Sequence, residues 1–435
     1  MGVLPRHLAF FATQAGAGGS IQDLDPVTPE RLDFAESWGW RLVMPALLYG
    51  GTAVGWVLIF VLGCRITNWL GFHRSESGQW RTGSGWWLAY YAALVLGGAW
   101  SADLGSWAWN LEVKSALWFF PVVAAIPGRR FSSDFWWSVG WSVVLYFTWR
   151  LLLAGWTEFV LGKPGKWTYA GFSGDVHPTY LGLHAAVALI GLGKEWARNV
   201  GRTGCGLLTV LLAVSIGLTG SKAGILAALL VALLGLAMMW LGTRNEAGRQ
   251  WAASLPLNGM CWMLFVAVLT FAAFGASKAR FAEMETAAEA IASEQVVVNS
   301  SSAGRVAVWR TSWEILREYP FGVGTGDVES ELMQRYASKG LRYAADRKLN
   351  PHNQWLQVGV ALGWPGILVF TLAMLSVFRW AYRERQGLAL LCAILVMFHA
   401  AFESVFEVQR GVVFILWMLM ALAPIFRRDR AVQHR

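Results

Sequence analysis

Long apolar stretches alternate with shorter polar ones along most of the sequence. A helix needs about 20 mostly apolar residues to cross a hydrocarbon core about 30 Å thick, and stretches of this kind recur here. The pattern predicts membrane-spanning helices near residues 42–63, 85–100, 113–126, 135–154, 178–193, 204–219, 222–241, 257–276, 353–378, 387–405 and 411–426.

One polar interval is much longer than the others and divides the chain. Residues 277–351 are too many for a simple connection between two spans, so they are expected to form a folded cap. The predicted parts are an N-terminal tail (1–40) with room for an extra crossing, a first block of spans (41–276), the cap (277–351), a second block (352–426) and a C-terminal tail (427–435).

The composition supports an all-α polytopic membrane protein. Of the 435 residues, 56% are hydrophobic and 14% are charged, whereas soluble domains carry about 25% charged residues. A membrane barrel would instead show alternating segments of about ten residues. The net charge of +9 comes from cations near the ends of the spans, which argues against nucleic acid as a partner and leaves membrane lipids.

The basic residues also predict an orientation. One set of alternate short loops carries 17 lysines and arginines, and the other set carries five. The richer set is expected to be cytoplasmic, which puts the C-terminus inside and the cap outside.

Within the cap, the sequence predicts three helices. Residues 277–295 and 327–340 have helical composition, and residues 305–319 place Trp309 and Trp313 at helical spacing. A loop is predicted over 296–304, and Pro320 followed by the glycine turn GVGTG ends the middle helix.

A histidine follows the cap directly, in the sequence Asn350-Pro351-His352-Asn353. Asparagine is a good N-cap and proline fits the first helical position, so His352 is predicted on the first turn of a spanning helix. The unpaired N–H groups there favour a neutral imidazole, which could act as a general base. An interfacial histidine that only caps the helix is the alternative.

Further polar residues are predicted on the same outer face. Singly, each is compatible with local capping, but together they favour a polar cavity under the cap. They are Arg150, His177, Lys222, Glu403, Glu407 and Arg410. Arg305 and Arg310 in the cap are candidates for binding an anion, although five residues place them about 140° apart around a helix. No grouping of histidines, cysteines or acids predicts a metal site.

Three motifs of the sequence resemble those of bacterial O-antigen ligases. His352-Asn353, nine further residues and then Gly363-Trp364-Pro365-Gly366 resemble the family signature H-[NSQ]-x9-G-x-x-[GTY]. The sequence PFGVGTGD at 320–327 resembles the glycine turn of the family's large periplasmic loop. TGSKAG at 219–224 resembles its T-x-S-[RK] element, with lysine where arginine is common. The resemblance covers roughly residues 165–415.

The resemblance implies a fold and a reaction. The fold would be a GT-C-like glycosyltransferase with about twelve transmembrane helices and a helical periplasmic cap, in the bacterial inner membrane. The donor would be a polysaccharide linked to undecaprenyl diphosphate, and the acceptor a sugar hydroxyl of the lipid A core. The transfer would be inverting and metal-independent, without cofactor or nucleotide.

The family's functional residues fall on particular positions of this chain. Its catalytic histidine corresponds to His352, its essential loop arginine to Arg305, and a second diphosphate contact to Lys222. We expect Arg310, Arg150 and Arg410 as further cations for the diphosphate. Asn353, Glu403 and His177 are expected to contact the sugar or to orient the imidazole.

Three other functions remain open at this point. O-antigen polymerases and protein O-oligosaccharyltransferases share the architecture and much of the motif. A transporter of lipid-linked sugars is the alternative outside enzymes, and it predicts central polar residues that are reached from both sides of the membrane.

Overall fold

The computed structural model describes residues 28–72, 82–128, 132–195, 197–244, 246, 263–270 and 301–422. This part of the chain contains helices and no strands, which confirms the all-α prediction. The helices are α2 (Pro29–Tyr49), α3 (Ala53–Phe72), α4 (Thr82–Leu96), η2 (Gly97–Trp100), α5 (Leu104–Val113), α6 (Ala116–Ala125), α7 (Ser132–Gly155), η3 (Trp156–Val160), α8 (Tyr169–Ser173), α9 (Pro178–Glu195), α10 (Ala197–Leu218), α11 (Lys222–Gly242), α14 (Ser301–Glu318), α15 (Val328–Ser338), α16 (Arg342–Asp346), α17 (Gln354–Arg383), α18 (Gly387–Phe402) and α19 (Gln409–Leu422).

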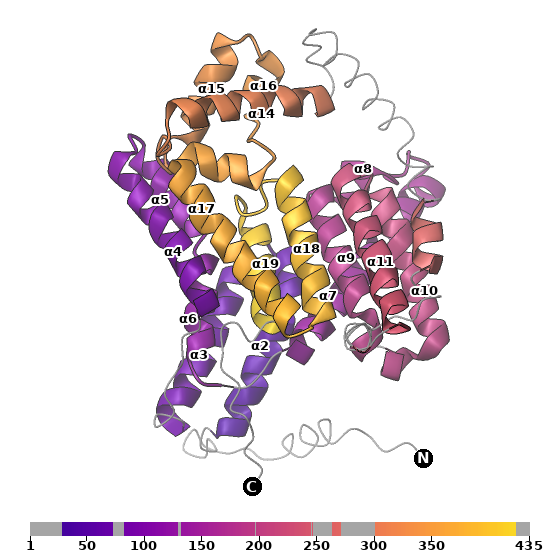
Figure 1. Ribbon diagram of the computed structural model, residues 1–435. Coiled ribbons are helices and arrows are strands. Elements are labelled where there is room, and N and C mark those ends of the chain that lie inside the picture. The colour runs from indigo at the N-terminus through magenta and orange to yellow at the C-terminus, as the bar shows by residue number, and fades with distance from the viewer. Residues whose placement is uncertain are drawn as a thin grey trace, which may run out of the picture.

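The helices form one bundle with a layer of cap helices across one end (Figure 1). Helices α17, α18 and α19 lie at the centre; α17 packs against α4 and α18, and α19 against α6. On the other side of this centre, α9 packs against α7, α10 and α11, and α11 also contacts α18. The cap helices α14, α15 and α16 cover the end at which α17 begins.

Several helices are suited to a bilayer. Four of the described helices are long and apolar enough to cross a membrane: Ala53–Phe72, Ser132–Val160, Lys222–Gly242 and Gln354–Arg383. Five shorter apolar helices accompany them: Ala116–Ala125, Pro178–Gly191, Thr203–Leu218, Gly387–Phe402 and Gln409–Leu422. The chain is therefore suited to pass the membrane several times, and the total of about twelve crossings stays a prediction.

The first predicted span, 42–63, is wrong. The structure has two helices here, α2 and α3, separated by a turn at 50–52. Gly50 caps α2, its N–H donating to the Ala46 carbonyl, and Gly51 has a φ of 40°, in the left-handed region that glycine tolerates best. Helix α2 starts at Pro29, behind the N-cap Thr28, and so begins within the predicted tail.

The cap contains two of its three predicted helices among the described residues. Helix α14 and helix α15 confirm the predictions over 305–319 and 327–340. Helix α14 begins at Ser301, four residues earlier than expected, so the end of the predicted 296–304 loop is helical. The predicted helix over 277–295 lies outside the described residues, as does most of the expected span 257–276, of which 263–270 is helical.

The glycine turn of the cap is inserted into a break in α17. Gly363 has a φ of 65° and interrupts the helix, which leaves backbone groups without helical partners. Val323 N donates to Val360 O (2.8 Å), and Trp364 N donates to Pro320 O (2.9 Å), so the turn and the break satisfy each other. A Cβ at position 363 would overlap the Pro320 carbonyl. The glycine of the signature is thus required by this contact.

A buried ion pair lies in the α2–α3 hairpin. Arg65 is one of the 17 basic residues that the sequence places in the richer set of loops. It lies inside α3 with its Nη2 2.6 Å from Glu36 Oε1, and both side chains are buried. Removal of one partner from such a pair leaves an uncompensated charge. Arg65 is therefore bound to α2 and contributes nothing to the orientation signal.

Candidate functional site

His352 lies immediately before α17 and not on its first turn. Asn353 is the N-cap, its Oδ1 accepting from Leu356 N at 3.0 Å, and the helix begins at Gln354. The sequence prediction that Asn350 caps the helix is therefore wrong by one turn. Asn350 Oδ1 instead accepts from His352 N at 2.9 Å, which closes a local turn typical of asparagine.

The backbone at His352 adopts a conformation that is unusual for histidine. Its φ of 46° lies in the left-handed region, which costs a non-glycine residue about 1–2 kcal/mol. Two contacts hold this conformation: the Asn350 side chain, and the indole N–H of Trp309 in α14, which donates to Pro351 O at 2.7 Å. Such strain persists where the surroundings determine it and is frequent at functional sites.

A glutamate at the end of the neighbouring helix α18 contacts the histidine. Glu403 directly follows α18, and its Oε1 lies 2.7 Å from His352 Nδ1. Arg305 Nη2 lies 3.5 Å from Glu403 Oε2. The carboxylate is buried, whereas the side chains of His352 and Arg305 are 20% and 32% exposed. The acid is thus covered, and the imidazole and the guanidinium stay accessible.

The charge of Glu403 follows from these neighbours. Burial by itself would raise the pKa of the carboxyl group, but the hydrogen bond from His352 and the electrostatic influence of the neighbouring His352 and Arg305 side chains outweigh burial, so the pKa lies below its ordinary value. An ionised Glu403 accepts a hydrogen bond from the Nδ1–H group of His352. That tautomer leaves the Nε2 lone pair free, and Nε2 has no hydrogen-bond partner among the described residues.

His177 joins the same electrostatic group from the start of α9. Burial lowers the pKa of His177. The Glu403 carboxylate acts to raise this pKa, whereas His352 and Arg305 act to lower it further. Thr179 N donates to His177 Nδ1 at 3.4 Å, which is consistent with a neutral ring whose Nε2 carries the proton. The predicted grouping of His177 with His352, Arg305 and Glu403 is therefore present in the structure.

The other predicted binding residues are distributed differently. Lys222 is the first residue of α11 and is half-buried at the capped end of the bundle. Arg310 is exposed, on a different side of α14 from Arg305. The Asn353 amide is engaged at both atoms, because its Nδ2 also donates to Ala401 O at 3.0 Å. Asn353 therefore ties α17 to α18 and has little capacity left for a sugar.

Arg150 and Arg410 bind backbone in the segment that leads to His177. Arg150 Nε donates to Phe172 O at 2.6 Å, and Arg410 Nη1 donates to Asp175 O at 2.7 Å. Both guanidinium groups thus stabilise the segment 171–175, which runs from α8 into the turn before His177. Among the described residues, neither arginine has a hydrogen bond to His352 or Glu403, and their expected role as cations of the diphosphate site stays a prediction.

Residues 207–371 match the family model described as O-antigen ligase. The match supports membership of the O-antigen ligase family. The match also confirms the resemblance seen in the sequence. Members of this family are glycosyltransferase-like ligases and polymerases. No curated protein matches the chain.

The family match covers part of the site just described. Lys222, Arg305 and His352 fall within the matched residues, while His177 and Glu403 lie outside them. The O-antigen ligase segment therefore supplies the histidine and the arginine, and the helices on either side supply the carboxylate and the second histidine.

The structure contains a second polar group near His352 that the sequence did not predict. Lys114 is buried with its Nζ 2.7 Å from Glu407 Oε2, and Gln354 Nε2 donates to Glu407 Oε1 at 3.0 Å. A lysine placed directly before an apolar helix was the available signal. Its partner is 293 residues away.

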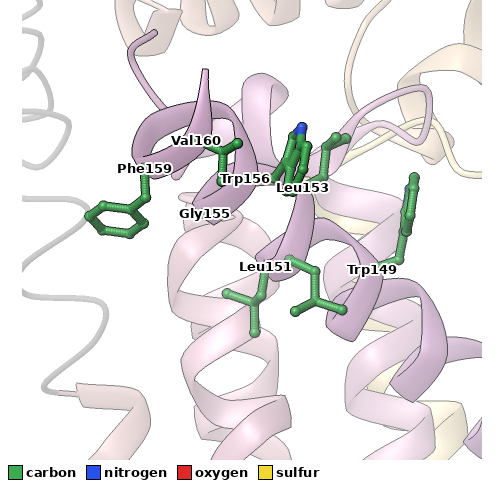
Figure 2. A pocket seen from close by; sticks show the side chains of 8 residues that line it. Trp149, Leu151, Leu153, Gly155, Trp156, Phe159 and Val160 are labelled. Atoms are coloured by element: carbon green, nitrogen blue, oxygen red, sulfur yellow. The ribbon is translucent and has the colours of Figure 1, made fainter. Parts of the chain in front are cut away.

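A large apolar pocket is lined by the last turns of α7 and by η3 (Figure 2). Its volume is about 680 Å³, and its lining residues are Trp149, Leu151, Leu152, Leu153, Gly155, Trp156, Phe159 and Val160. The lining has no ionisable side chain, so the pocket suits hydrocarbon rather than a diphosphate. Among the described residues, no three His, Cys, Asp or Glu side chains form a group that could hold a metal ion.

Proposed function

We propose that this chain is an O-antigen ligase. It transfers polysaccharide from undecaprenyl diphosphate to a sugar hydroxyl of the lipid A core, at the periplasmic face of the bacterial inner membrane. The observation that carries the proposal is the 2.7 Å contact of His352 with a buried carboxylate that also pairs with Arg305. The family match over the segment with both residues supports it.

His352 acts as the general base. Its Nε2 takes the proton of the acceptor hydroxyl while the hydroxyl oxygen attacks the anomeric carbon of the donor. The Nδ1–H bond to Glu403 fixes the ring orientation, and the carboxylate offsets the positive charge that forms on the imidazole. A positioned base of this kind typically contributes about 10²–10⁴-fold in rate.

Arg305 stabilises the leaving group. The bond between the anomeric carbon and the phosphate oxygen breaks as the new bond forms on the opposite face, so the configuration inverts and the electron pair stays on the diphosphate. Arginine keeps its charge and binds phosphate oxygens in pairs. Fixed cations directed at the leaving oxygen replace the charge that a metal ion would supply. Lys222 is the second cation of this proposal.

Glu403 also lets two cations work side by side. An imidazolium and a guanidinium that lie side by side repel each other, and this repulsion makes the histidine a weaker base. The carboxylate lies between them, 2.7 Å from one and 3.5 Å from the other. The base and the diphosphate-binding group can therefore share one small site.

The first experiment compares substitutions in a strain that lacks its own ligase. We expect His352→Ala and Arg305→Ala to abolish polysaccharide-capped lipopolysaccharide on gels, with unchanged protein level. Arg317→Ala, which changes an exposed arginine in the last turn of the same helix, is the matched control and should remain active. Capped lipopolysaccharide in either of the first two variants would refute the assignment.

The second experiment identifies the acceptor. Purified protein receives one lipid-linked donor together with lipid A-core, a second lipid-linked chain, or a serine- and threonine-rich peptide. Transfer to lipid A-core alone supports the ligase. Extension of the lipid-linked chain would instead identify a polymerase, and modification of the peptide an oligosaccharyltransferase. Transport without transfer would show a carrier.

A further inference from the structure

A buried charged network joins the two segments that carry His352 and Glu403. Lys114, at the junction of α5 and α6, is only 2% exposed, and its Nζ contacts Glu407 Oε2 at 2.7 Å and Asn110 Oδ1 at 2.9 Å. Glu407 lies in the turn between α18 and α19, four residues after Glu403.

The same glutamate reaches the start of α17. Its Oε1 accepts from Gln354 Nε2 at 3.0 Å, and Gln354 Oε1 accepts from Phe406 N at 2.9 Å. Gln354 is fully buried and lies two residues after His352. The Gln354 side chain thus makes two hydrogen bonds to the 403–408 turn, one to the Glu407 side chain and one to the Phe406 backbone.

The network also contacts the cap. Asn110 Nδ2 donates to Thr325 O in the glycine turn at 3.3 Å, and that turn is inserted into the break of α17. Lys114 therefore lies where three segments converge: the glycine turn, the start of α17 and the turn that follows α18.

A buried ion pair is a poor means of gaining stability, because an apolar pair of similar volume is often at least as stabilising. Its charged hydrogen bonds do, however, fix geometry. We propose that Lys114, Glu407 and Gln354 are positioning residues that hold Glu403 against His352. This inference rests on the proposed function, since it concerns the rate of the step that His352 performs.

The decisive variant replaces the pair by an apolar one, Lys114→Met with Glu407→Met, so that no charge remains unpaired. The matched control replaces the cap ion pair Lys339–Glu314 in the same way; it joins α14 to the end of α15, outside the network. Three quantities are measured in lipid nanodiscs: the thermal midpoint, the kcat and KM for the lipid-linked donor, and the rate at which diethyl pyrocarbonate acylates His352.

We expect the Lys114/Glu407 double variant to keep a thermal midpoint close to that of the control. Its kcat should fall about 10²-fold, the effect of a displacement of about 1 Å at a reacting group, with KM changed less than about threefold. Acylation of His352 should slow towards the rate of Glu403→Gln, because the ring loses its fixed carboxylate partner.

A folded double variant with wild-type kcat and wild-type acylation would overturn the inference. So would a loss of kcat that only follows a loss of folded protein, with His352 acylated at the normal rate. If the wild type itself transfers no glycan, the proposed function fails, and the acylation rates still decide whether the network positions His352.

Discussion

Replacing Glu403 by glutamine tests the site most directly, because it removes one charge and keeps the size of the side chain. Glu403 is 4% exposed, and its oxygens contact His352 Nδ1 at 2.7 Å and Arg305 Nη2 at 3.5 Å. The amide oxygen of the variant can still accept from His352 Nδ1–H, whereas its NH2 group cannot accept from Arg305. The variant also loses the negative charge that offsets the imidazolium formed during transfer.

The expected magnitude follows from the geometry. With the two charge centres about 4 Å apart and an effective dielectric constant of about 20, the lost attraction is about 4 kcal/mol. Each 1.4 kcal/mol, roughly, is a factor of ten in rate, so kcat should fall about 10³-fold. The KM for the donor should change far less, since Arg305 remains in place.

The assay is transfer from a lipid-linked oligosaccharide to lipid A-core by purified protein in nanodiscs, followed under single-turnover conditions. Glu331→Gln is the control, because Glu331 is an acid of the cap paired with Arg335 within α15. If Glu403→Gln is folded and retains more than about a tenth of the wild-type kcat, the carboxylate does not assist the histidine.

Three further predictions concern the scaffold and its response to pH. Gly363→Ala should destabilise the protein by roughly 2–5 kcal/mol in denaturant unfolding, from the left-handed backbone and the overlap with the glycine turn; an unchanged unfolding midpoint would refute that packing. Arg150→Leu should lower the free energy of unfolding by roughly 1.5–3 kcal/mol, because the hydrogen bond to Phe172 O is lost. The KM for the donor should be nearly unchanged; a large rise in this KM would instead show that Arg150 binds the diphosphate. Because the folded-state pKa of Glu403 lies below its ordinary value of 4.5, its contribution to stability is present above that pH and is lost as the pH falls through the folded pKa. The thermal midpoint of the wild type should therefore drop more steeply below about pH 4.5 than that of Glu403→Gln, and parallel curves would contradict this assignment.

The sequence by itself determined the features that depend on local composition. Apolar stretches of helical length predicted the membrane helices, and the spacing of Trp309 and Trp313 predicted α14. The histidine and the cap arginine were found through motif spacing, which is read along the chain. The errors are local as well: two glycines divide the first span, and the Asn350 side chain delays the start of α17 until after His352.

Only the tertiary structure decided which polar side chains meet. Glu403 is 51 residues from His352 and 98 from Arg305, and nothing near it in the sequence distinguishes it as their partner. Arg150 and Arg410 carry the same charged group as Arg305, yet both donate to backbone carbonyls of the segment that leads to His177. The physical reason is that hydropathy and capping act within a few residues, whereas a buried charge takes its partner from whichever segment packing brings against it.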